Sequence, residues 1–186
     1  MNKYVLLDRD GTIIVNKHYQ KDPAITELIP NAREGLDKLR RAGFKLVVTS
    51  NQSGIARGYM TSADVDAVNQ SMVRLLGGGD DYFAGMYYCP HVTADDCRCR
   101  KPGPGLAETA GAELGFSPED AYVVGDRDAD IEFGAGVGAT TVLVRTGYGA
   151  ATEREGKVSP DWIADDLLAA AEWILSREGV REGVKS

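Results

Sequence analysis

Short apolar runs that alternate with segments of helical spacing are the feature that most constrains the fold of this sequence. Five such runs are rich in β-branched, leucine or aromatic residues and carry few or no charges: residues 4–7, 44–49, 86–88, 121–124 and 140–144. Strands that are apolar on both faces are typical of a parallel sheet with helices on each side. The pattern therefore predicts an α/β fold.

The helical segments lie between these runs and after the last one. The expected helices cover residues 31–41, a stretch from the capping sequence Thr61-Ser62-Ala63-Asp64 to Gly77, and residues 104–114, 128–135 and 167–175. Connections of these lengths leave no room for a large inserted cap domain. We predict one doubly wound (Rossmann-like) α/β domain over residues 1–186, with a frayed tail from about residue 177 and a site at the carboxyl ends of the strands.

The charge of the chain excludes several classes of partner. Lys and Arg number 21 against 28 Asp and Glu, which gives a formal net charge of -7 at pH 7. Such a surface repels nucleic acid backbones and anionic lipid headgroups. No apolar run approaches the length of a spanning helix, and charged residues follow the first strand too soon for a signal peptide. We expect a cytoplasmic monomer that binds neither nucleic acid nor membrane.

Four polar groups follow predicted strands or the loop that carries the cysteines. They are Asp8-Arg9-Asp10-Gly11-Thr12, Ser50-Asn51-Gln52, Arg100-Lys101-Pro102 and Gly125-Asp126-Arg127-Asp128. Alternate residues of an extended segment share a face, so Asp8 and Asp10 can point into one crevice, where their charges repel unless a cation is present. With Asp126 from another strand end, they predict a Mg²⁺ site that also takes substrate phosphate oxygen.

The same groups have the chemistry that phosphoryl transfer needs. An aspartate can attack phosphorus, and a second carboxyl group, here that of Asp10, can protonate the leaving oxygen and then activate water. Ser50 and Lys101 can supply a hydrogen bond and a positive charge to the transferring group. A single aspartate at a strand end is more often a cap or turn residue. The four groups in this order favour an active site instead.

All three cysteines lie in one short stretch of the chain, together with a histidine: Cys89, His91, Cys97 and Cys99. An odd number of closely spaced cysteines does not resemble a disulfide framework. Three thiolates and one imidazole suit a closed tetrahedral Zn²⁺ site, which would be structural and would fix the loop leading into Lys101. The alternative is free or buried thiols beside a solvated histidine.

The order of these motifs resembles the haloacid dehalogenase superfamily of phosphatases. The resemblance covers the chain to about Gly147 and is carried by the four polar groups above. It implies that Asp8 is the nucleophile, Asp10 the general acid and base, and Ser50 and Lys101 the pair that stabilises the phosphoryl group. It also implies a Mg²⁺ ion held by Asp8, Asp126 and the backbone carbonyl of Asp10, a small anionic phosphate substrate, and a capless branch of the superfamily.

Within that superfamily, the cysteine loop looks like two related capless groups, the heptose bisphosphate phosphatases of bacterial heptose nucleotide synthesis and the histidinol-phosphate phosphatases. The segment from Asn51 to Gly58 is similar to the first group, which we favour, whereas the compact loop and Gly125-Asp126-Arg127 look more like the second. Guanidinium groups bind phosphate oxygens bidentately, so three arginines are candidates for a second phosphate. The resemblance implies substrate contacts at Asn16, Lys17, His18, Tyr19, Asn51, Gln52, Ser53, Arg57, Arg100 and Arg127.

Two readings of another class remain open. A non-catalytic phosphoacceptor signalling module also sets acidic residues and a lysine on a parallel sheet, but its acceptor follows a later strand than the first. A zinc-organised binding module explains the cysteine loop, but leaves Asp8, Asp10, Ser50 and Asp126 without a task. Multiple turnovers of phosphate release distinguish an enzyme from both.

Overall fold

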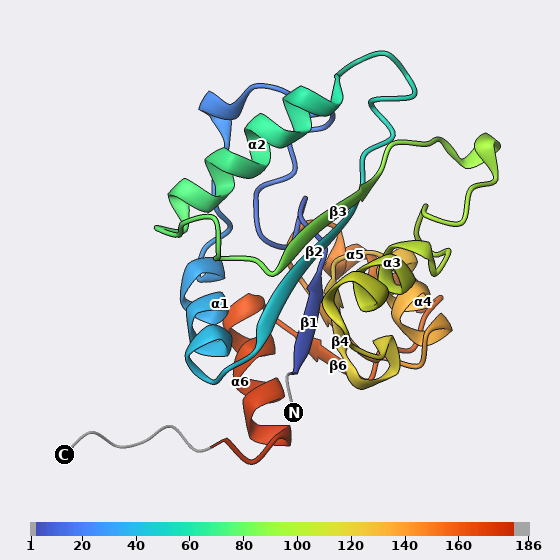
Figure 1. Cartoon of the computed structure of the whole chain (residues 1–186). Helices are drawn as coiled ribbons and strands as arrows, with labels where there is room; N and C mark the ends of the chain where they lie inside the picture. Colours follow the sequence, from blue (N-terminus) through green and yellow to red (C-terminus); the bar gives the residue numbers. More distant parts are fainter. Residues whose placement is uncertain (1–2, 181–186) are drawn as a thin grey trace.

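A six-stranded parallel sheet forms the centre of the protein (Figure 1), in a computed structural model that describes residues 3–180. The strand order is β3-β2-β1-β4-β5-β6, and all neighbouring strands run parallel. The predicted α/β class and parallel sheet are confirmed. The strands are β1 (Tyr4–Leu7), β2 (Lys45–Asn51), β3 (Gly85–Cys89), β4 (Tyr122–Gly125), β5 (Thr140–Val144) and β6 (Trp162–Ala164).

Helices cover both faces of the sheet, as the apolar strands require. In Figure 1, α1 and α6 pack side by side on one face with α2 above them, and α3 and α4 lie on the other face. Thr61 caps α2 through the capping box that the sequence predicts. The helices are α1 (Ala32–Arg41), α2 (Ser62–Leu75), α3 (Gly105–Leu114), α4 (Asp128–Gly136), α5 (Gly149–Glu155) and α6 (Leu167–Arg177).

Successive side chains of β1 enter different halves of the core. Val5 and Leu7 pack with α1, α2 and α6, whereas Tyr4 and Leu6 pack with α3 and α4. All four residues are buried, because a strand with helices on both sides has no solvent face. This two-sided burial fixes the register of β1, since a shift by one residue would exchange the two halves of the core.

The chain reverses its direction of winding at β1, and this places the functional end of the sheet. From β1 the sheet grows outward through β2 and β3 on one side and through β4, β5 and β6 on the other. Leu7 at the end of β1 pairs with Val124 of β4, and the Asp8 N–H donates to the Val124 carbonyl at 2.9 Å. Residues that follow β1, β2 and β4 therefore meet at one edge of the sheet.

Two elements were not predicted, β6 and α5. Trp162–Ala164 is a three-residue strand at the sheet edge, and its tryptophan is 45% exposed, so the segment lacks the apolar run of a buried strand. Gly149–Glu155 is a short helix whose only buried residue is Gly149, so it has no apolar stripe.

The predicted frayed tail includes residues 181–186, which lie outside the described residues. Between residues 3 and 180, no helix combines the length and apolar character that a membrane span requires.

The contact between α1 and α6 depends on the absence of a side chain at Gly35. A methyl group at Gly35 would lie 2.5 Å from the Leu167 carbonyl oxygen, so Gly35→Ala forces the helices apart. We expect the free energy of unfolding to fall by about 1–3 kcal/mol. Urea unfolding measures it.

The matched control is Gly136→Ala, at the end of α4. A methyl group at Gly136 meets no atom within 4 Å, so this variant should be neutral or more stable by up to about 1 kcal/mol. Equal destabilisation of the two variants would contradict the packing argument.

Candidate active site

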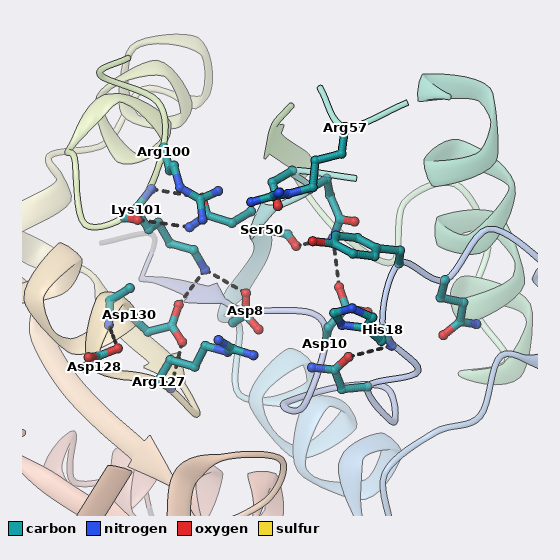
Figure 2. A pocket seen from close by; sticks show the side chains of 17 residues that line it. Asp8, Asp10, His18, Ser50, Arg57, Arg100, Lys101, Arg127, Asp128 and Asp130 are labelled. Carbon is teal, nitrogen blue, oxygen red and sulfur yellow. Dashed lines mark hydrogen bonds and ion pairs between the residues drawn. The ribbon is translucent and has the colours of Figure 1, made fainter. Parts of the chain in front are cut away.

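A buried lysine joins two aspartates at the carboxyl end of the sheet (Figure 2). The Lys101 Nζ donates to Asp8 Oδ1 at 2.7 Å, to Asp130 Oδ1 at 2.6 Å and to the Thr49 carbonyl at 2.7 Å. Lys101 is only 4% exposed, so its ammonium group satisfies its three donors entirely within the protein. The loop before α3, the end of β1 and the first turn of α4 thus meet at this ammonium group.

Burial dominates the electrostatics of these groups. It raises the pKa of Asp8, and the neighbouring Lys101 ammonium offsets only part of that rise. Burial also raises the pKa of Asp126, and the charges of Asp8 and Asp130 add to the effect. For Lys101, burial alone would lower the pKa, but Asp130 and Asp8 together raise it above its ordinary value. The lysine therefore stays charged, while the aspartates lack enough positive charge around them.

The third aspartate of the cluster, Asp126, has an oxygen with no partner. Its Oδ2 accepts a hydrogen bond from the Tyr148 N–H at 2.7 Å, but its Oδ1 is buried and has no hydrogen-bond partner among the described residues. Side chains at Gly11 and Gly147, both at positive φ, would collide with this carboxylate. One oxygen from each of Asp8, Asp126 and Asp130 lies within 4.8 Å of the others. This set of carboxylate oxygens fits a hard cation such as Mg²⁺.

The Asp10 carboxyl group belongs to a second hydrogen-bond network. Its Oδ2 accepts hydrogen bonds from Gln52 Nε2 at 2.8 Å and from Arg9 Nε at 3.0 Å. The same Gln52 nitrogen lies 2.7 Å from Ser50 Oγ, so Gln52 connects the ends of β1 and β2. Asp8 and Asp10 both line the pocket, as the alternation of side chains predicts.

Asn51 holds the backbone of Lys101 with two hydrogen bonds. Its Nδ2 donates to the Lys101 carbonyl, and its Oδ1 accepts from the Lys101 N–H, both at 3.0 Å. An amide that pairs with a peptide group in this way fixes both the position and the direction of that segment. The end of β2 therefore places the lysine that reaches Asp8.

The open part of the site is a pocket of about 450 Å³. Asp8 and Lys101 are buried and form its floor, whereas Arg57 and Arg127 are exposed and Arg100 is partly exposed, so these arginines form its rim. In Figure 2, Arg57 and Arg100 lie on one side of Asp8, and Arg127 lies on the other. Of the residues predicted to act on or bind the substrate, the structure brings the following to this pocket: Asp8, Asp10, Asn16, His18, Tyr19, Ser50, Asn51, Gln52, Ser53, Arg57, Arg100, Lys101 and Arg127.

Lys17 is the one predicted substrate contact that does not line the pocket. Its Nζ donates to the Ile25 carbonyl at 2.6 Å and lies 3.1 Å from a Glu27 carboxylate oxygen. The ammonium group is thus used to tie the loop after β1 to the 3₁₀-helix that begins at Pro23. A motif match gave the position along the chain but not the direction of the side chain.

Four polar or aromatic side chains lining the pocket or contacting it had no predicted role. Asp130 stood in the motif Gly125-Asp126-x-x-x-Asp130, and this spacing was the signal that could have identified it. Gln20 and Asp128 also line the pocket. The Tyr148 ring lies under the Arg127 guanidinium at 4.0 Å from the ring centroid, a contact between segments that no local pattern indicates.

Comparisons with known proteins identify the family. A family model described as HAD-hydrolase-like matches residues 98–170. A Pseudomonas putida protein named D-glycero-beta-D-manno-heptose-1,7-bisphosphate 7-phosphatase is 35% identical over 93% of this chain and 99% of its own length. The protein of the same name from Escherichia coli K12 is 38% identical, over 88% of each chain. The chain belongs to this phosphatase family.

The fold of a solved family member agrees with this assignment. The D,D-heptose 1,7-bisphosphate phosphatase from B. bronchiseptica, complexed with magnesium and phosphate, superimposes with a TM-score of 0.87. It is 30% identical and covers 94% of this chain and 99% of its own. This chain is therefore a phosphoric monoester hydrolase of the haloacid dehalogenase-like fold, and the reading as a non-catalytic signalling module is not needed.

The enzyme gathers its three cysteines and His91 into one cluster beside the pocket. The Cys89 Sγ lies 3.2 Å from the Cys99 Sγ and 3.6 Å from the Cys97 Sγ. The His91 Nδ1 lies 3.3 Å from the Cys99 Sγ. In a tetrahedral site with Zn–S bonds of about 2.3 Å, neighbouring sulfur atoms are about 3.8 Å apart, so this somewhat tighter set of four ligands is compatible with Zn²⁺. The arrangement leaves no open position for water.

The same cluster connects to the basic rim of the pocket. The Arg100 Nη1 donates to the His91 carbonyl at 3.1 Å, and Arg100 and Lys101 directly follow Cys99 in the chain. A metal ion bound here would hold the loop that supplies both cations.

Substitution of one cluster residue should release the metal. We expect Cys97→Ser to lower the zinc content of the purified enzyme well below one ion per chain, because one ligand of a closed site is lost. Turnover should fall as well, since the loop that places Lys101 is less ordered. Elemental analysis of both proteins measures the zinc. The absence of zinc from the unmutated enzyme would contradict the assignment.

Proposed function

We propose that this enzyme removes the 7-phosphate of D-glycero-D-manno-heptose 1,7-bisphosphate, with Mg²⁺ as cofactor. The observation that carries the proposal is the charge arrangement of the pocket, with a buried lysine and aspartate at the floor and three guanidinium groups at the rim. The floor suits the phosphate that reacts, and the rim suits the one that remains. The names of the relatives specify the β anomer, and we propose the same anomer here.

In the first step, an Asp8 carboxylate oxygen attacks the phosphorus of the 7-phosphate. A bond forms between Asp8 and phosphorus while the bond from phosphorus to the sugar oxygen breaks, and Asp10 gives its proton to that oxygen. Asp8 is positioned for this role by Lys101, whose Nζ donates a hydrogen bond to Asp8 Oδ1. The sugar leaves as an alcohol, and Asp8 carries the phosphoryl group.

In the second step, water attacks the same phosphorus atom. Asp10, now ionised, takes a proton from this water, and the bond between Asp8 and phosphorus breaks. Inorganic phosphate leaves, and both aspartates return to their starting states. The Lys101 ammonium and the Ser50 hydroxyl stabilise the charge on the transferring group in both steps.

Mg²⁺, held by Asp8, Asp126 and the backbone carbonyl of Asp10, would neutralise part of the negative charge on the phosphoryl oxygens. The unpartnered Asp126 Oδ1 supports this assignment. Asp130 does not need to bind the ion, because its oxygens are used by Lys101 and by the Arg127 N–H. We propose that Asp130 positions the lysine.

The rim favours a bisphosphate over an amine-bearing phosphate. Arg57, Arg100 and Arg127 line the opening, and Asp128 is the acidic side chain beside them. Histidinol phosphate carries its ammonium group on the carbon next to the one that bears the phosphate, and its far end is an imidazole ring, so it offers no second anion to these guanidinium groups. A second phosphate at that end forms charge-assisted hydrogen bonds instead.

Removal of the proposed nucleophile should abolish turnover without loss of the fold. We expect kcat of Asp8→Asn to fall by about 10⁴-fold or more, because no residue replaces the attacking oxygen. The melting temperature should not fall, since one buried negative charge is removed. Asp66→Asn, at an exposed position on α2, is the control and should keep full activity. Full activity of Asp8→Asn in a phosphate-release assay would rule out the assignment.

The substrate is tested by phosphate release with Mg²⁺ on D-glycero-β-D-manno-heptose 1,7-bisphosphate and on L-histidinol phosphate. We expect kcat/KM to be at least about 100-fold higher for the heptose, because the rim binds a second phosphate, which histidinol phosphate lacks. Arg127→Ala should reduce this preference by about tenfold. Preference for histidinol phosphate would reject the proposal, and so would the release of phosphate from neither substrate.

A further inference from the structure

Arg9 is a charged side chain that the proposed reaction does not use, although it lies between the two reacting aspartates in sequence. It is 1% exposed, and it is among the largest fully buried side chains of the described residues. Burial of a guanidinium group is unfavourable unless its donors are matched, and a buried ion pair seldom adds net stability. A role in the site is therefore a better explanation for this residue than a role in the core.

The guanidinium group of Arg9 connects α2 to Asp10. Its Nε and Nη2 lie 3.0 Å and 2.9 Å from Asp10 Oδ2, and its Nη1 donates to Asn69 Oδ1 at 2.8 Å. Asn69 is 6% exposed, and it lies on α2 beside the core residue Val68. The position of Asp10 is thus tied to a helix rather than to the loop that carries it.

The two oxygens of the Asp10 carboxyl group have different surroundings. Oδ2 accepts from Arg9 Nε, lies 2.9 Å from Arg9 Nη2 and accepts from Gln52 Nε2, so N–H groups point at it from two residues. No described residue makes a hydrogen bond to Oδ1. A proton on Oδ2 would face these donors, whereas a proton on Oδ1 would not. Oδ1 is therefore the oxygen suited to carry the proton.

We propose that Arg9 and Asn69 are positioning residues that fix the Asp10 carboxyl group, so that Oδ1 exchanges the proton in both steps. The proposal rests on the proposed function, in which Asp10 is the acid and base. In the first step the proton leaves Oδ1 for the sugar oxygen as its bond to phosphorus breaks. In the second, a proton of the attacking water goes to Oδ1 as the bond between phosphorus and Asp8 breaks.

The test compares two substrates that differ in their need for a proton. A sugar alkoxide leaves only if it is protonated, whereas p-nitrophenolate leaves without a proton. The ratio kcat/KM reports the steps up to departure of the first leaving group, so it isolates the first proton transfer. For Asn69→Leu we expect kcat/KM to fall about tenfold on the heptose bisphosphate and less than about twofold on p-nitrophenyl phosphate.

A conservative variant and a control separate positioning from folding. Asn69→Asp keeps an oxygen for Arg9 Nη1 and should restore the ratio between the two substrates to that of the unmutated enzyme. Ser71→Ala removes a partly buried hydrogen bond on the same helix, from Ser71 Oγ to the Pro23 carbonyl at 2.9 Å, and should leave the ratio unchanged. If Asn69→Leu does not fold, Arg9→Lys replaces it, because one ammonium group cannot reproduce the forked contact.

Three results would overturn the inference. The first is an equal loss on both substrates in Asn69→Leu or Arg9→Lys, which indicates a merely structural role. The second is an unchanged ratio in those variants while Asp10→Asn changes it, which leaves the proposed function intact and removes only the positioning role. An unchanged ratio in Asp10→Asn itself rejects Asp10 as the acid, and with it the proposed function and this inference.

Discussion

The rest of the pocket depends on the ammonium group of Lys101. Three carboxylates, those of Asp8, Asp126 and Asp130, are almost fully buried at one edge of the sheet, where their charges are poorly screened. Lys101 is buried with them and binds two of them directly. One ammonium group among three carboxylates reduces their mutual repulsion, but it does not neutralise their combined negative charge. That shortfall favours the binding of a divalent cation, whose charge would in turn offset that of a phosphoryl group.

Lys101 lies in a loop, and contacts from neighbouring segments hold that loop in place. Asn51, at the end of β2, makes two hydrogen bonds to the backbone of Lys101. The three cysteines and His91 lie together in the segment immediately before Lys101. Asp10 is held by a direct hydrogen bond from Arg9, and Arg9 is held in turn by its hydrogen bond to Asn69. Groups that act on a reacting atom must be held to within a fraction of an ångström, and rigid neighbours can do this where loops alone cannot.

The sequence predicts the parts of this arrangement that local patterns encode. Apolar runs locate the five longer strands, and motif order brings Asp8, Ser50, Lys101 and Asp126 to the carboxyl end of the sheet; Ser50 itself lies within β2. The short edge strand β6 cannot be predicted in this way, because its stability comes from pairing with β5 rather than from its own composition. The direction of Lys17 is decided by Glu27 and the Ile25 carbonyl, and the task of Asp130 by a lysine 29 residues away. These are tertiary contacts, which spacing along the chain does not reveal.

The contrast between an acidic protein and a basic pocket rim bears on turnover as well as on binding. The net charge of -7 repels anions from most of the surface, so the guanidinium groups at the pocket stand out as the place where a phosphate is attracted. In the proposed reaction, the substrate carries two phosphate groups and each product carries one. The substrate can therefore engage the floor and the rim at once, whereas neither product can. The same charges that select a bisphosphate thus hold its products less tightly, which favours their release.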